Sequence, residues 1–138
     1  MLNPGPLPKE ERGPLRCGEC NGHLDLELLE PSDEARAAVE RFHECFDGLF
    51  FAWFYGGENA EAAAVTFDDK DAEVHQLGLA AAKAIGARYV WFATESDPMM
   101  GRAPKASFDA CPNCGSELSP LGRWAGCVSC VVAVPSAG

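Results

Sequence analysis

The sequence lacks the features that most directly reveal a function. Its longest apolar run extends only from Leu49 to Tyr55, far short of the roughly 18–20 residues that cross a bilayer. It contains no glycine-rich phosphate loop, no dinucleotide fingerprint and no nucleophile–base pairing of recognisable spacing. We therefore expect no membrane association, and an enzyme is the less favoured class. No catalytic and no organic-cofactor-binding residues are predicted.

Basic side chains are also scarce. The chain carries 11 Lys and Arg against 21 Asp and Glu, a formal net charge of −10. The excess is concentrated between Cys17 and His75, where 15 acidic residues stand against three basic ones. Because an acidic surface repels the phosphate backbone, this charge disfavours nucleic acid as a partner. A protein partner is expected instead.

The N-terminal region has no apolar core of a signal peptide. Its first ten residues contain three prolines, and we expect a flexible tail over residues 1–15 and a cytoplasmic protein. The hydrophobic fraction of 47% excludes a disordered acidic chain.

Cysteine is abundant for a chain of 138 residues, with seven copies. Reducing compartments do not maintain structural disulfides, so these cysteines indicate metal or thiol chemistry. Cys45 stands alone, and the other six form Cys-x-x-Cys pairs: Cys17/Cys20, Cys111/Cys114 and Cys127/Cys130.

The two C-terminal pairs have the spacing of a closed zinc site. In the first pair, Pro112 presets φ for a tight turn and Gly115 tolerates a positive φ. Twelve residues separate Cys114 from Cys127, enough for a short hairpin that returns the second pair to the metal. The alternative is a redox dithiol or two reduced, unliganded pairs. We predict a structural Zn²⁺ held by Cys111, Cys114, Cys127 and Cys130.

Residues 109–132 resemble the rubredoxin-like zinc ribbons, and residues 16–55 resemble a degenerate copy of one. The C-terminal ribbon departs from the pattern at Val131, where the first knuckle has glycine, which leaves the turn geometry of the second knuckle open. In the N-terminal copy the return pair is reduced to Cys45, with Gly48 where a second cysteine would sit.

A second zinc ion is predicted in this N-terminal copy. Its predicted ligands are Cys17, Cys20, Cys45 and His43, with His23 and Asp47 as alternatives to His43. The prediction conflicts with helical spacing over residues 33–46, because two residues on a continuous helix that are separated by two positions point about 200° apart. The ribbon needs that helix to end before Phe42; otherwise Cys45 is a small buried hydrophobe. Sharing an ion between Cys17/Cys20 and a distant pair would cost only about 1 kcal/mol more in loop closure.

Hydrophobic periodicity predicts an α+β fold. Strands are expected at 23–29, 49–55, 62–67, 88–94 and 131–134, and helices at 33–46 and from Asp68 or Asp69 to Ile85, ended by Gly86. The expected parts are the tail, a degenerate zinc-ribbon module (16–57), a strand-helix-strand unit (58–97), a linker (98–107) and a C-terminal zinc ribbon (108–134).

Three further features have a structural and a functional interpretation. Trp124, preceded by Arg123, either covers the zinc site or is an exposed anchor for a partner. His75 is expected to be solvated on the charged face of its helix. The acidic run from Asp68 to Glu73 is expected to favour a helix N-terminus.

The sequence thus favours a non-catalytic zinc-binding adaptor or accessory protein that acts through protein–protein interaction. One alternative is a transcription- or RNA-related zinc ribbon that binds nucleic acid. Another is a metalloenzyme or thiol-redox protein that uses the incomplete first zinc site.

Overall fold

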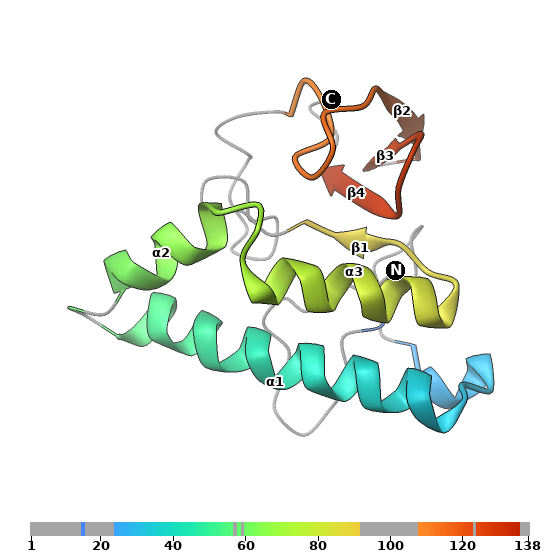
Figure 1. Ribbon diagram of the computed structural model, residues 1–138, viewed down its shortest axis with the longest axis horizontal. Helices are drawn as coiled ribbons and strands as arrows, with labels where there is room; N and C mark the ends of the chain where they lie inside the picture. The colour runs from blue at the N-terminus through green and yellow to red at the C-terminus, as the bar shows by residue number, and fades with distance from the viewer. Residues whose placement is uncertain are drawn as a thin grey trace.

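The computed structural model describes residues 15, 24–56, 58, 60–91, 108–122 and 124–135. A short 3-10 helix, η1 (Leu26–Leu29), is followed by three helices and a four-stranded sheet, which confirms the α+β class. The helices are α1 (Asp33–Tyr55), α2 (Ala60–Asp68) and α3 (Glu73–Ile85), and the strands are β1 (Tyr89–Val90), β2 (Leu118–Leu121), β3 (Trp124–Cys127) and β4 (Val132–Pro135). In Figure 1, α3 lies between α1 and β1, and the remaining strands lie beyond β1.

Helix α1 begins as predicted and extends further than predicted. The Ser32 Oγ accepts a hydrogen bond from the Ala35 N–H at 3.1 Å, which caps the helix. Phe42 and Phe46 are fully buried, and Phe50 continues the same face half-buried. The strand predicted at 49–55 is therefore wrong. A short apolar run carries no period of its own, and the helix that precedes it continues through it.

The strand predicted at 62–67 is also wrong, because these residues belong to α2. Alanine is the strongest helix former, and a three-alanine stretch favours a helix more than a strand. Ala63 and Phe67, four residues apart, are buried on one face. The central unit is consequently helix, helix and strand instead of strand, helix and strand.

Helix α3 starts later than predicted and ends where predicted. The acids before it form a turn in which the Asp69 Oδ1 accepts from the Asp71 N–H at 2.9 Å, and the first helical residue is Glu73. Gly86 ends the helix in the left-handed conformation, with φ of 69°.

The sheet has the order β1-β4-β3-β2. Strands β2, β3 and β4 pair antiparallel, and β1 is parallel to β4. The strand expected at 88–94 is observed at Tyr89–Val90; residues 92–94 lie outside the described residues. The strand predicted for 131–134 is confirmed as β4, beginning at Val132.

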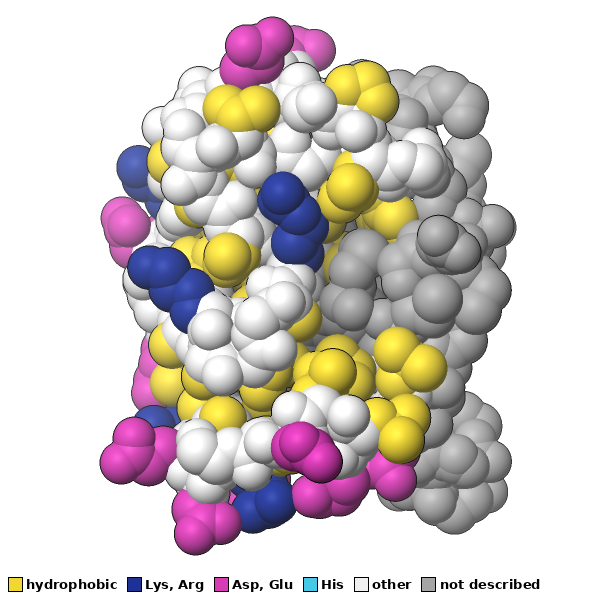
Figure 2. All heavy atoms as spheres, turned by 90° about the vertical axis from the view of Figure 1, so that its right-hand side faces the viewer, with side chains coloured by type: hydrophobic (Ala, Val, Ile, Leu, Met, Phe, Trp, Pro, Cys, Tyr) yellow, Lys and Arg dark blue, Asp and Glu magenta, His cyan; other side chains and the backbone are white. Residues whose placement is uncertain are grey.

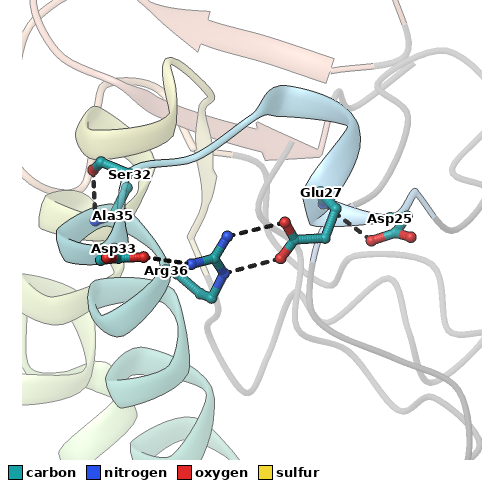
Figure 3. Close-up of polar contacts among 6 residues, drawn as sticks. All are labelled: Asp25, Glu27, Ser32, Asp33, Ala35 and Arg36. Carbon is teal, nitrogen blue, oxygen red and sulfur yellow. Dashed lines mark hydrogen bonds and ion pairs between the residues drawn. The ribbon is translucent and has the colours of Figure 1, made fainter.

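The strand predicted at 23–29 is wrong where it is described, because Leu26–Leu29 form η1. Asp25 caps this turn through a bond from the Glu27 N–H to its Oδ1. Figure 3 shows how η1 is tied to α1: the Arg36 guanidinium bonds both carboxylate oxygens of Glu27, at 2.9 and 3.0 Å, and one oxygen of Asp33 at 2.9 Å. Local polar contacts thus override the alternating pattern.

Figure 2 views the side of the molecule on which η1 and the start of α1 lie. Hydrophobic side chains gather over the lower half of this face, and acidic side chains line its lower edge. Leu24, Leu28 and Leu29 are exposed. Among the described residues, no helix is both long enough and apolar enough to cross a membrane.

One hydrophobic core joins the helices to the sheet. It contains aromatic side chains of α1, α2 and β1, and Cys111 and Cys127 belong to the same cluster. Phe42 contacts Tyr89 edge-on, with ring centroids 5.5 Å apart. The predicted linker at 98–107 lies outside the described residues, so the predicted domain boundaries stay predictions.

Candidate metal centre

The four C-terminal cysteines come together at the end of the sheet. Their Sγ atoms all lie within 4.8 Å of one another, and the Sγ atoms of Cys114 and Cys127 are 3.5 Å apart. Those of Cys111 and Cys130 are 3.6 Å apart. A tetrahedron of thiolates bonded at about 2.3 Å to one ion has edges of about 3.8 Å, whereas a disulfide is about 2.05 Å long. The cluster therefore fits one tetrahedral ion and not two disulfides.

The first knuckle is a turn that needs glycine at its end. Gly115 has φ of 76°, and its N–H donates to the Cys111 carbonyl at 2.9 Å. The Cys111 N–H in turn donates to the Ser116 carbonyl at 2.9 Å. A Cβ at Gly115 would meet nothing within 4 Å, so the backbone angle and not the space requires glycine, as the sequence predicted.

The second knuckle tolerates Val131 because it ends differently. Among the described non-glycine residues, only Glu30 has a positive φ, so Val131 is not in the left-handed region. Its carbonyl accepts a hydrogen bond from the Tyr89 N–H at 2.7 Å. After the second knuckle the chain thus continues directly into β4, which pairs with β1. The first knuckle instead ends in a turn at Gly115.

The surroundings shift the pKa of the Cys111, Cys114 and Cys130 thiols in different directions. Burial raises the pKa of Cys111 and of Cys130, whereas hydrogen bonds from Ser116 lower the pKa of the exposed Cys114 thiol to about 6. The Ser129 N–H points at the Cys127 Sγ, 3.3 Å away. Such donors stabilise thiolates. Because a thiol must lose its proton to bind a divalent ion, a raised pKa such as that of Cys111 couples metal affinity to pH.

The Arg88 side chain stabilises the second knuckle through hydrogen bonds to backbone carbonyl groups. Its Nη1 donates to the carbonyls of Cys127 at 3.2 Å, Cys130 at 3.4 Å and Val132 at 3.1 Å. A Cβ at Gly126 would lie 3.0 Å from this nitrogen, so glycine there leaves room for the guanidinium. A four-thiolate site with a divalent ion carries a local charge of about −2, and Arg88 places a positive charge beside it.

Sequence reasoning missed Arg88. No motif spacing connects it to cysteines that lie about forty positions further along the chain, and only the parallel pairing of β1 with β4 brings it there.

The predicted N-terminal site is only partly described. Cys17, Cys20 and His23 lie outside the described residues. His43 and Cys45 lie in the uninterrupted α1, which places them on different sides of the helix. The structure therefore does not bring this pair together.

Cys45 is half-buried and packs against the core, and burial raises the pKa of its thiol. His43 has its Nε2 3.7 Å from Asp47 Oδ1. Within the described ranges, the C-terminal cysteines are the one group of three or more His, Cys, Asp and Glu side chains that come close enough to share a metal ion.

The prediction that His75 is solvated is wrong. The ring is fully buried and stacks on Trp91 with centroids 3.9 Å apart. Its Nε2 lies 2.7 Å from the Phe67 carbonyl, which can only accept, so Nε2 carries the proton and Nδ1 accepts from the Tyr89 hydroxyl at 2.8 Å. Burial lowers the pKa of His75. Helical periodicity predicts that His75 lies on the charged face of its helix. The contacts of its ring with Tyr89 and Trp91, which are 14 or more positions away, cannot be read from the local sequence.

Trp124 is buried, with 4% of its surface exposed. This burial rules out its use as an exposed partner anchor in this conformation, and the interpretation that it covers the zinc site stays a prediction. Arg123 lies outside the described residues, and its predicted role stays a prediction.

Comparison with known proteins identifies no relative: no family model, no curated protein and no solved structure matches this chain.

Proposed function

We propose that this chain is a non-catalytic zinc-binding adaptor in which residues 108–135 form a zinc ribbon. The observation that supports the proposal is the closed set of four sulfur atoms within 4.8 Å of one another. Four protein ligands complete the tetrahedral coordination that structural zinc prefers and leave no position for water or substrate. Catalytic zinc keeps such a position open.

Thiolate ligands favour zinc over magnesium or calcium, which take oxygen ligands. Zinc bound there fixes both knuckles and the hairpin between them, a role that a module of about 25–30 residues cannot fill with a hydrophobic core. The acidic helical unit, residues 24–91, then supplies the surface for a protein partner. In the cytoplasm, where thiols stay reduced, the site would remain competent to bind metal.

Elemental analysis of the purified, reduced full-length chain tests the metal. We expect zinc that is lost from Cys127→Ser and retained by Cys45→Ser, the control with a single thiol removed from the helical unit. A second zinc that disappears in Cys45→Ser would support the predicted N-terminal site. Native protein that folds without metal and ignores strong chelators would disprove the proposal.

Cobalt substitution tests whether the site is closed. Four thiolates around Co²⁺ are expected to give an intense tetrahedral spectrum that added small anions do not change. A spectrum that shifts with added anions would indicate an open position and favour a metalloenzyme. Tight, salt-sensitive binding of labelled RNA or DNA, measured by anisotropy, would favour the nucleic-acid alternative instead.

A further inference from the structure

The outward side of α1 changes character along its length. Its first part carries exposed acids at Glu40, Glu44 and Asp47, and its last part carries exposed aromatic rings at Phe51 and Tyr55. These two rings are 61% and 67% exposed, and their centroids lie 5.0 Å apart. An aromatic pair therefore stands on the solvent side of the helix, next to negative charge.

Neither ring belongs to the hydrophobic core that the described residues form. The opposite side of α1 supplies that core through Phe42 and Phe46, both buried, and through half-buried Phe50 and Trp53. A pair four residues apart on a helix stabilises it by only about 0.2–0.5 kcal/mol, whereas burial of one large apolar side chain is worth about 1.5–3 kcal/mol. Most of the favourable free energy of burying Phe51 remains available to a partner.

Gly48 marks the same side of the helix, three residues before Phe51. A Cβ there would meet nothing within 4 Å, and Gly48 is not among the glycines with a positive φ. Neither space nor backbone angle requires glycine, although glycine inside a helix costs about 1 kcal/mol relative to alanine. The missing side chain leaves a bare stretch of backbone on the side of the helix that carries Phe51.

The charge around the rings indicates the sign of a partner. Residues 24–91 contain 14 acidic and five basic side chains. Asp47 precedes Phe51 by one helical turn, and Glu58 follows the end of the helix, both exposed. The C-terminal end of a helix also carries a partial negative charge. A basic ligand is attracted to this end, and an acidic one or an anionic membrane is repelled.

We propose that this surface, the α1 stripe (Glu44, Asp47, Gly48, Phe51 and Tyr55), binds a basic amphipathic helix of a partner protein. Apolar side chains of that helix cover the ring pair and the bare backbone at Gly48, and its Lys and Arg side chains face the acids or the ring faces. This inference rests on the proposed adaptor function and names its surface and partner class.

Fluorescence anisotropy with a labelled helical peptide of leucine and lysine, and with the zinc-loaded full chain, tests the stripe. We expect Phe51→Ser/Tyr55→Ser to weaken binding roughly tenfold or more, as truncation of aromatic anchors does. Leu28→Ser removes an exposed side chain of η1 and is expected to leave binding unchanged. A scrambled peptide without an apolar face is expected to bind much more weakly.

A second pair of variants tests the charge. Glu44→Gln/Asp47→Asn is expected to lower affinity and to reduce its salt dependence, whereas Asp109→Asn/Glu117→Gln removes the same charge from the ribbon and is expected to change little. Amide shifts in a two-dimensional NMR spectrum are expected along residues 44–55. Thermal melts of each variant verify that it remains folded.

Three results would overturn the stripe: equal binding by wild type and Phe51→Ser/Tyr55→Ser, equal binding of the scrambled peptide, or NMR shifts confined to other elements. A concentration-dependent dimer that Phe51→Ser/Tyr55→Ser abolishes would also overturn it, since the occupant is then a second copy. Peptide binding elsewhere leaves the adaptor function standing, whereas an open metal site or tight nucleic-acid binding overturns that function.

Discussion

The helical unit and the ribbon are stabilised in different ways. In the helical unit, the Phe46 ring contacts those of Phe42 and Phe67, with centroids 6.0 and 5.6 Å apart, and all three rings are buried. In the ribbon, β2 is largely exposed, and the hairpin converges on four sulfur atoms. Aromatic packing thus stabilises the first region, whereas the second carries the proposed metal site at its four cysteines. The two regions meet at β1 and Arg88, which tie the second knuckle to α3.

The largest expected effect is the loss of the metal. Cys127→Ser removes one ligand, and zinc contributes about 10–16 kcal/mol of binding free energy in small zinc modules. We expect amides of residues 111–135 to lose hydrogen-exchange protection while α1 and α3 keep theirs. Cys45→Ser is the matched control. Simultaneous loss of protection in all helices would show that the two regions form one cooperative unit.

Two glycine substitutions probe the helical unit in opposite directions. A Cβ at Gly78 would lie 2.6 Å from a Tyr89 ring carbon, so Gly78→Ala is expected to destabilise the protein by about 1–3 kcal/mol. Gly48→Ala, at an open position, is expected to stabilise it by up to about 1 kcal/mol. Urea unfolding measures both. Equal effects of the two changes would contradict the close contact between α3 and β1.

Arg88→Met tests the junction between the two regions. It removes the guanidinium from three carbonyl groups, and hydrogen bonds from a charged donor are worth about 1.5–3 kcal/mol. We expect a loss of stability of about 2 kcal/mol and faster transfer of zinc to a coloured chelator. Lys83→Met, at an exposed position of α3, serves as the control. Unchanged zinc transfer would mean that Arg88 supports the sheet alone.

The smallest expected effect is a pH dependence from His75. Because burial lowers its pKa in the folded state, the unfolded chain takes up the proton first as the pH falls. Its contribution is complete above the unfolded value of about 6.5 and decreases below it, by at most about 1.4 kcal/mol per pH unit. Unfolding free energies between neutral and mildly acidic pH measure this slope. His75→Gln should reduce the slope, and an unchanged slope would assign it to other titrating groups.

Some elements were predictable because their causes are local. Ser32 caps α1 with a side chain three residues from its partner amide, and Gly86 ends α3 through its own backbone angle. The four C-terminal cysteines were equally readable, since Cys-x-x-Cys spacing and Gly115 set the turn geometry that brings thiols to one ion. The α+β class followed from the same periodicities.

Other features depend on contacts between distant segments. The alanine-rich and aromatic runs at 62–67 and 49–55 fit either period, and packing against the core decided that both are helical. The burial of His75 requires Tyr89 and Trp91 to contact its ring, and the placement of Arg88 beside the second knuckle requires β1 to pair with β4. The sequence by itself therefore determined the C-terminal four-cysteine cluster, the helix caps and the acidic charge, because these depend on neighbouring residues. Tertiary structure decided which side chains are covered, because burial is a property of the assembled elements and not of any one of them.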